Sequence, residues 1–261
     1  MARNLVNIHM PFLRASLALS ALLLLTSAAA HPASGSTAAC MPFVGEHMEF
    51  SVGWEFINAG TAVIQVASPQ DNVYRTHIMA KTNAFLDMFK KVRDEITAEG
   101  RCNNGNLQST LFELKQLEVK YRANKKTEFF WPEGKVHYTQ NDRTDIYDVE
   151  PHEVDVMDAF FAVRSMPLKP GDTFNIAVFD SRKNYKIVVN VLKIERLRAP
   201  WRKWVECLVI EPKLKTEGIF SSRGQIKVWM TNDERHIPIK MTAKIRFGRI
   251  VAKLTGYRKD S

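Results

Sequence analysis

Residues 226–254 read IKVWMTNDERHIPIKMTAKIRFGRIVAKL, and the alternation in this stretch decides the fold. Apolar side chains take every second position on both sides of the polar turn at 232–235, as in strands that bury one face. Trp229 falls on the other, cationic side, so one aromatic is predicted among lysines. The stretch predicts three antiparallel strands with one apolar and one cationic face, near 225–231, 236–246 and 249–257.

The two faces of these strands can be assigned residue by residue. Alternation puts Ile239, Met241 and Ile245 on the apolar face, which we expect to be buried. Lys240 and Lys244 alternate with them, and we expect both to reach solvent.

The same pattern continues through most of the chain. Alternating residues run from Met48 to Phe56, and the sequence Asn58-Ala59-Gly60 predicts a turn into a return strand. No internal repeat and no clear linker divides the rest of the chain. Further strands are predicted near 73–81, 92–99, 107–114, 117–123, 127–131, 135–140, 143–149, 173–179, 185–196 and 204–211.

Two short segments replace this alternation with helical spacing. One begins at Asn83 and ends near Lys91, and the other runs from Asp155 to Arg164; Asn and Asp both cap helix N-termini well. The predicted fold class is therefore mainly β: a single curled antiparallel sheet or open barrel with two short accessory helices. The aromatic residues of the helices exceed what such short segments need, and they are Phe85, Phe89, Phe160 and Phe161.

The N-terminal segment has the pattern of an export signal. Arg3 and Arg14 precede the apolar run 17–25, and Ala28 and Ala30 form an A-x-A cleavage signature. The run is shorter than the ~20 residues of a membrane span, and no later stretch approaches that length. We predict a periplasmic protein without a transmembrane segment in its mature chain, divided into a signal peptide at 1–30, a flexible leader at 31–43 and one β-rich domain at 44–258.

The three cysteines form an odd set. Cys207 alternates with apolar neighbours, so we expect a buried free thiol. Cys40 and Cys102 are candidates for a disulfide in an oxidising compartment, although the sequence leaves their distance open. Thr37-Ala38-Ala39-Cys40 also resembles a lipobox, which gives an alternative location as an outer-membrane lipoprotein attached through Cys40.

No catalytic constellation is visible in the sequence. It lacks G-x-S-x-G, H-E-x-x-H, C-x-x-C and a glycine-rich phosphate loop, and its histidines are scattered. Carboxylates between Asp142 and Asp158 could do acid–base work, but alternation separates neighbours onto opposite faces, and Asp155 is expected to cap a helix. We therefore predict no enzyme, no catalytic residue, no metal ligand and no cofactor.

Several short sequence segments together resemble the bacterial envelope proteins of domain-of-unknown-function family 3108. The resemblance spans 44–257, and it implies an exported β-rich protein with no established activity and no catalytic residue to transfer. The implied fold is similar to the half-barrels of periplasmic lipoprotein carriers. The segments are Gly45-Glu46, Trp54 with 59–62, Val92-Arg93-Asp94, 158–164, 168–172, 228–233, 235–239 and Phe247-Gly248.

These observations leave three functions open. The leading hypothesis is a non-catalytic periplasmic binding or envelope-maintenance protein that holds an amphiphilic, lipid-like ligand in an apolar concavity. The net charge of +9 favours an anionic envelope component as partner and export disfavours nucleic acid, although the cations could simply be solvated strand faces. Phe85, Phe89, Phe160 and Phe161 would form a gate or wall, unless they only fill the core. The alternatives are an interaction module that pairs with an envelope protein and a carboxylate-based hydrolase of cell-wall glycans.

Overall fold

The computed structural model describes residues 40–88, 91–118, 121–215, 225–245 and 248–260. All of them belong to the second of two units in the chain, residues 34–261. The predicted signal peptide and most of the predicted leader lie outside the described residues, as does Phe89.

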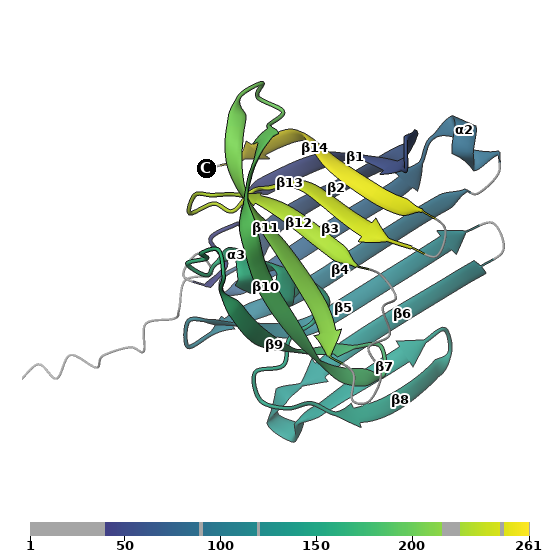
Figure 1. The fold of residues 1–261 in the computed structure, drawn as a ribbon. Helices are drawn as coiled ribbons and strands as arrows, with labels where there is room; N and C mark the ends of the chain where they lie inside the picture. The colour runs from purple at the N-terminus through teal and green to yellow at the C-terminus, as the bar shows by residue number, and fades with distance from the viewer. Residues whose placement is uncertain (1–39, 89–90, 119–120, 216–224, 246–247, 261) are drawn as a thin grey trace, which may run out of the picture. The chain divides into compact units, whose positions relative to one another are not determined.

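Fourteen strands form one antiparallel sheet, which confirms the predicted fold class (Figure 1). The first eight are β1 (Glu46–Trp54), β2 (Ile57–Gln70), β3 (Val73–Thr82), β4 (Val92–Asn103), β5 (Asn106–Glu118), β6 (Tyr121–Phe130), β7 (Lys135–Gln140) and β8 (Arg143–Asp148). The others are β9 (Thr173–Asp180), β10 (Lys183–Arg198), β11 (Trp204–Lys215), β12 (Ile226–Thr231), β13 (Pro238–Lys244) and β14 (Arg249–Lys259).

The strand order shows two meanders joined in the middle of the sheet. It runs β8-β7-β6-β5-β4-β3-β2-β1-β14-β13-β12-β11-β10-β9, so the first strand pairs with the last. Residues after β8 then bring the two outer strands together. Val154 forms a parallel bridge with Val178 of β9, and the ring centres of Tyr147 of β8 and Phe179 of β9 are 5.8 Å apart. The sheet is therefore curled almost into a barrel.

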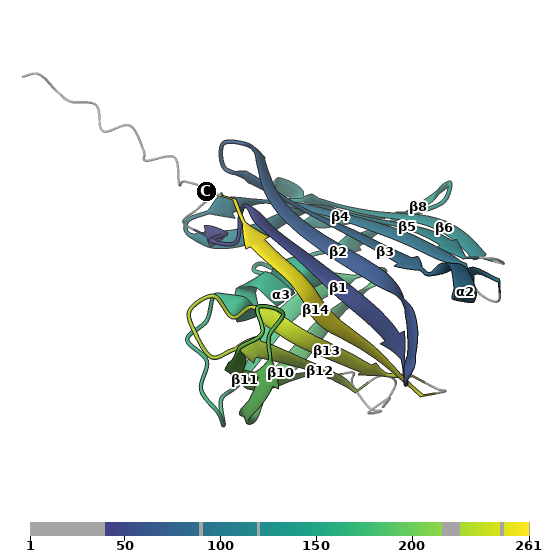
Figure 2. The same ribbon diagram turned by 90° about the horizontal axis from the view of Figure 1, so that it is seen from above.

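Helix α3 (Val156–Arg164) fills the interior of this curl (Figure 2). It packs against β4, β5 and β9, with apolar residues of β9–β12 on one side and of β2–β4 on the other. Helix α2 (Ala84–Asp87) follows β3, and a 3-10 turn spans Trp131–Glu133. None of the described helices is long and apolar enough to cross a membrane.

Local signals predicted both helix starts correctly. Asn83 accepts from Leu86 N, and Asp155 accepts from Met157 N and Asp158 N, so both cap as expected. Strands β12–β14 match their predicted ranges closely. Ile239 is buried and Met241 is half-buried, but the prediction for Ile245 is wrong. Ile245 is 43% exposed, because β13 ends one residue earlier and the chain has left the covered part of the sheet.

The predicted turn at residues 58–60 is also wrong. The chain turns between β1 and β2 at Glu55, whose φ of 51° lies in the left-handed region. Gly60 instead lies inside β2, where an added Cβ would come within 2.0 Å of the Lys81 carbonyl oxygen. This glycine permits close approach of β3, and the displaced turn leaves Phe56 at a hairpin tip.

Strands β5 and β6 replace three predicted strands, 107–114, 117–123 and 127–131. Polar residues such as Gln116 and Asn124 suggest breaks there, but both lie within continuous ladders: Gln116 pairs with Asp94, and Asn124 with Lys115. An antiparallel sheet with one solvent-exposed face can hold such polar residues within a continuous strand.

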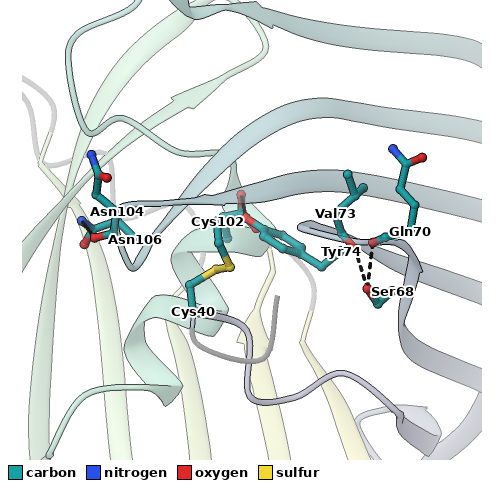
Figure 3. Close-up of a disulfide and its surroundings, with 9 residues drawn as sticks. Cys40, Ser68, Gln70, Val73, Tyr74, Cys102, Asn104 and Asn106 are labelled. Carbon is teal, nitrogen blue, oxygen red and sulfur yellow. Dashed lines mark hydrogen bonds between the residues drawn. A yellow bond between two sulfur atoms is a disulfide. The ribbon is translucent and has the colours of Figure 1, made fainter. Parts of the chain in front are cut away.

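The structure joins Cys40 and Cys102, the pairing that the sequence left open (Figure 3). Their Cα atoms are 5.7 Å apart. The sequence assigns residues 40–43 to the leader, whereas the structure buries Cys40, Met41 and Phe43 in an apolar cluster with Phe161 of α3. Cys207 is a buried free thiol, and burial raises its pKa to about 11.

Candidate functional site

The curled sheet has two unlike ends. Strand β1 runs from the end where α3 lies, at Glu46, to the opposite end at Trp54, beside α2. We call the first the closed end and the second the open end. The ladders carry this polarity through the sheet, because Trp54 lies opposite both Ile57 of β2 and Ile250 of β14.

An ion pair inside the closed end holds the last turn of α3. Arg164 Nη1 and Nη2 donate to the two carboxylate oxygens of Glu46 at 2.8 and 3.0 Å, and both side chains are at most 2% exposed. Arg164 Nε also donates to the His236 carbonyl (3.1 Å), and its guanidinium lies 3.9 Å from the centre of the Phe43 ring. Glu46 accepts in addition from the Tyr257 hydroxyl. Every donor nitrogen of this guanidinium is thus used, as a buried charge requires.

A second polar cluster holds the first turn of α3. The hydroxyls of Tyr74 and Ser109 both donate to Asp158 Oδ2, at 2.9 and 2.5 Å. Burial raises the pKa of Asp158 to about 6, despite these two hydrogen bonds. Burial, together with the charge of Asp158, also raises the pKa of Asp155, whose Oδ2 has no hydrogen-bond partner among the described residues. Gly100 is required here, because an added Cβ would lie 2.2 Å from the Tyr74 hydroxyl.

The carboxylates of this cluster have the raised pKa values of general acids, but their position favours an anchoring role. Asp155 and Asp158 are 2% and 1% exposed, and both are engaged with the backbone or hydroxyls that fix α3. Asp142 lies in the turn before β8 and is exposed. The described residues contain no group of His, Cys, Asp and Glu that could hold a metal ion.

Neither closed-end cluster is predicted from the sequence, although a signal is present. Glu46 alternates with Met48 and Phe50, so its carboxylate lies on the apolar face of β1. Arg164 follows Phe160 and Phe161 at helical spacing and therefore lies on the buried side of α3. A charge at an apolar position implies a buried partner, but the sequence alone does not say which one.

The inner face of the open end is lined with apolar side chains that α3 does not cover. Ile64, Ile78, Ile96 and Leu114 lie directly opposite one another on four successive strands, β2 to β5. These side chains lie on the inner face of the sheet. Tyr74 and Ile78 are four residues apart on β3, so alternation places them on the same face, and Tyr74 contacts α3. Ile64 is buried, whereas the other three are only partly buried.

The facing wall continues this lining. Trp54, Ile250, Ala243 and Ile226 form a row across β1, β14, β13 and β12. Trp54 and Ile226 are 39% and 42% exposed. Ile64 and Ile78 pack in one apolar cluster with residues of β1, β13 and β14, while Ile96, Leu114 and Ile226 stay partly or largely exposed.

A cationic cavity of about 220 Å³ lies on the other face of β12–β14. Lys240 lies over the Trp229 ring, with its Nζ 4.3 Å from the ring centre, so the aromatic predicted on the cationic face is found there. Burial, then the charges of Lys253 and Arg249, lowers the pKa of Lys240. No described carboxylate lies within 4 Å of Lys244 or Arg249. The cavity is lined by Gln225, Lys227, Trp229, Lys240, Thr242, Lys244 and Arg249.

The structure does not bring the four predicted phenylalanines together. Phe161 is completely buried and stacks on Phe43 with ring centres 5.5 Å apart, while Phe160 packs edge-on to it. Phe85 lies on α2 at the open end and is 55% exposed. Phe89 is outside the described residues. Helical spacing identified apolar segments, but it carries no information on which end of the sheet each helix occupies.

This chain belongs to a family described only as "Protein of unknown function (DUF3108)", whose model matches residues 49–255. The predicted family is therefore confirmed. The match includes β2 to β13 and α3, and it indicates no catalytic family.

Among solved structures, the fold is similar to a beta-barrel-like protein of domain-of-unknown-function family DUF1849 from Brucella abortus. The TM-score is 0.63 at 11% identity, and the alignment covers 84% of this chain and 99% of the other. At this identity the likeness concerns the fold alone. No curated protein matches the chain. A non-catalytic binding module is compatible with both similarities.

Proposed function

We propose that this protein is a non-catalytic binding module that holds the apolar part of an amphiphile at the open end of its curled sheet. The observation that carries the proposal is the incompletely buried lining formed by Ile78, Ile96 and Leu114 on one wall and Ile226 on the other. A protein of this size normally closes such surface against its own side chains. Here α3 does so only at the closed end.

The test is a titration with dansylated undecanoic acid, followed by its fluorescence. Ile96→Gln places a polar group on the inner wall, and the loss of apolar contact of roughly 1–1.5 kcal/mol should weaken probe binding about tenfold. Thr97→Gln is the matched control, because Thr97 is the next residue of β4 and lies on the outer face beside His77. Equal binding by both variants would remove the open end as the site. No saturable binding by the wild type would leave the interaction module as the better hypothesis.

We propose that the protein works in the periplasm after removal of residues 1–30. The Cys40–Cys102 disulfide supports an oxidising compartment. It also argues against the lipoprotein alternative, because a Cys40 sulfur bonded to Cys102 is not available for a lipid thioether. Intact mass of the protein from periplasmic extract checks this: we expect an N-terminus near His31 and no lipid. A diacylglyceryl adduct on Cys40 would reverse the assignment.

A further inference from the structure

The hairpin tips at the open end expose large apolar side chains. Phe56, between β1 and β2, is fully exposed, and Met88, after α2, is 73% exposed. Leu117 and Tyr121 add apolar surface at the β5–β6 tip, and Ile245 follows β13. We call the described tip residues of β1–β6 and β12–β14 the rim: 54–57, 81–88, 91–93, 115–118, 121–122, 225–226, 244–245 and 248–249. The β7–β8 turn at Asn141-Asp142 and the β9–β10 turn at Ser181-Arg182 are polar and are not part of it.

The rim forms one continuous border, because the ladders bring its tips side by side. Trp54 of β1 pairs with Ile250 of β14, Gly60 of β2 with Thr82 of β3, and Val92 of β4 with Glu118 of β5, so each tip adjoins the next. Nine of the large apolar side chains that the described residues expose lie on this border, and they are Trp54, Phe56, Ile57, Phe85, Met88, Leu117, Tyr121, Ile226 and Ile245.

The charges of the rim are mostly positive. Seven Lys and Arg side chains lie among the rim residues, against the three carboxylates of Glu55, Asp87 and Glu118. Asp87 is already paired with Arg93, whose Nη1 lies 3.0 Å from its Oδ1. Lys244 and Arg249 belong both to the rim and to the cationic cavity around Trp229. Exposed apolar tips therefore alternate with cations along the border.

The geometry of the sheet does not demand apolar tips. At the closed end the corresponding turns are Asp71-Asn72 and Asn104-Gly105, which are polar and adopt positive φ at Asn72, Asn104 and Gly105. Figure 3 shows Asn104 and Asn106 at one of these turns, beside the disulfide. The β2–β3 and β4–β5 turns thus carry ordinary turn residues, whereas the β1–β2 and β3–β4 tips of the rim expose hydrophobes.

We propose that the rim docks on an anionic lipid bilayer. Aromatic and aliphatic side chains at loop tips enter the headgroup region, and neighbouring Lys and Arg add attraction to negatively charged lipids. Docking in this orientation would place the apolar lining of the open end directly against the membrane. The inference rests on the proposed binding of an amphiphile, because it supplies the route by which that ligand enters and leaves.

The test uses protein purified from cells that express the full-length chain. Sedimentation with vesicles of phosphatidylglycerol and phosphatidylethanolamine is compared with sedimentation with phosphatidylcholine vesicles. We expect binding to the anionic vesicles that weakens at high salt. Phe56→Ser with Met88→Ser should reduce the apparent affinity at least tenfold, and Lys244→Gln with Arg249→Gln should reduce it about tenfold.

The matched control also replaces one aromatic residue and one methionine, but away from the rim. Trp204 of β11 is 63% exposed at the closed end, and Met79 is 46% exposed on the outer face of β3. Trp204→Ser with Met79→Ser should leave vesicle binding unchanged. Equal loss in the control and the rim variant would overturn the proposal, as would absence of wild-type binding to anionic vesicles.

The acyl-probe titration without vesicles separates this proposal from the function on which it rests. The Phe56→Ser, Met88→Ser variant should bind the probe as the wild type does. Probe binding without vesicle binding would overturn only the proposal that the rim docks on lipid. Vesicle binding without probe binding would overturn only the proposal that the open end binds an amphiphile. Concentration-dependent self-association that these two substitutions abolish, without vesicle binding, would show that the rim contacts a second copy and not lipid.

Discussion

The closed and open ends of this sheet share their strands but differ in what their side chains do. At the closed end, Arg164 and Asp158 are buried and engaged, and the β2–β3 and β4–β5 hairpins turn through polar residues. At the open end, Phe56 and Met88 extend into solvent. The buried charges that fix α3 thus lie at one end, and the hairpin tips of the other end expose large apolar side chains.

The largest expected effect comes from breaking the ion pair at the closed end. Arg164→Met leaves the Glu46 carboxylate buried without its main partner, so the free energy of unfolding should fall by roughly 3–5 kcal/mol. Urea denaturation measures it. Arg75→Met is the control: Arg75 forms an exposed pair with Glu99 (2.6 Å), and its loss should cost about 1 kcal/mol or less. Similar losses for both would mean that the buried pair does not anchor α3.

The second effect is on the pH dependence of the free energy of unfolding, to which the two ends of the sheet contribute with opposite sign. The pKa of Asp158 is raised to about 6 by burial, so the folded state binds this proton more tightly than the unfolded state, whose pKa is about 3.9. The resulting stabilisation is complete below about pH 4 and is lost as pH rises through about 6, a change of about 3 kcal/mol. Asp158→Asn should reduce this slope in the free energy of unfolding, and Asp155, whose pKa burial also raises, accounts for the part that remains.

Asp87, at the open end, gives the opposite slope. Its hydrogen bonds from Arg93 and Thr82 lower its pKa to about 2, so the stabilisation it provides is present above about pH 4 and is lost as pH falls towards 2. Asp87→Asn should therefore flatten only the acid limb of the stability curve. If the Asp158 and Asp87 variants changed the same limb, the assignment of Asp158 as the buried acid would be wrong.

The smallest effect is expected at the rim. Phe56→Ser and Met88→Ser remove exposed side chains with little packing, so each should change the free energy of unfolding by no more than ~0.5 kcal/mol. Thermal unfolding checks this, and it also shows that weaker vesicle binding does not arise from misfolding. A loss above about 1 kcal/mol would indicate that these side chains support the fold.

The sequence predicts the strands and helices better than it predicts the tertiary contacts between them. Alternation located β12–β14 closely, and Asn83 and Asp155 marked the helix starts, because both signals depend on adjacent residues. Partners such as Glu46 and Arg164 stand 118 residues apart, and no local pattern joins them. The hairpin β1–β2 was misread because Gly60 resembles a turn residue, while its role is to admit the Lys81 backbone.

The candidate site was harder to predict for a related reason. Phe85 and Phe161 have similar local sequence surroundings, yet one is exposed at the open end and the other is buried at the closed end. Only the connection between strands decides which end a helix reaches. The residues of the cationic cavity were easier to predict. Lys240 and Lys244 alternate on one strand with Trp229 beside them, so the sequence places all three on one face.

The pairing of β1 with β14 also constrains how the chain can fold. Glu46 lies opposite Lys259, so the contact that joins the two meanders links residues at opposite ends of the domain sequence. The hairpins on either side are local and can form early, whereas this join must await the C-terminal strand. A chain that lost its last strand would keep both meanders but leave β1 and β13 as long unpaired edges, which are templates for aggregation. Pairing of β14 with β1 and β13 is therefore the step that protects the sheet.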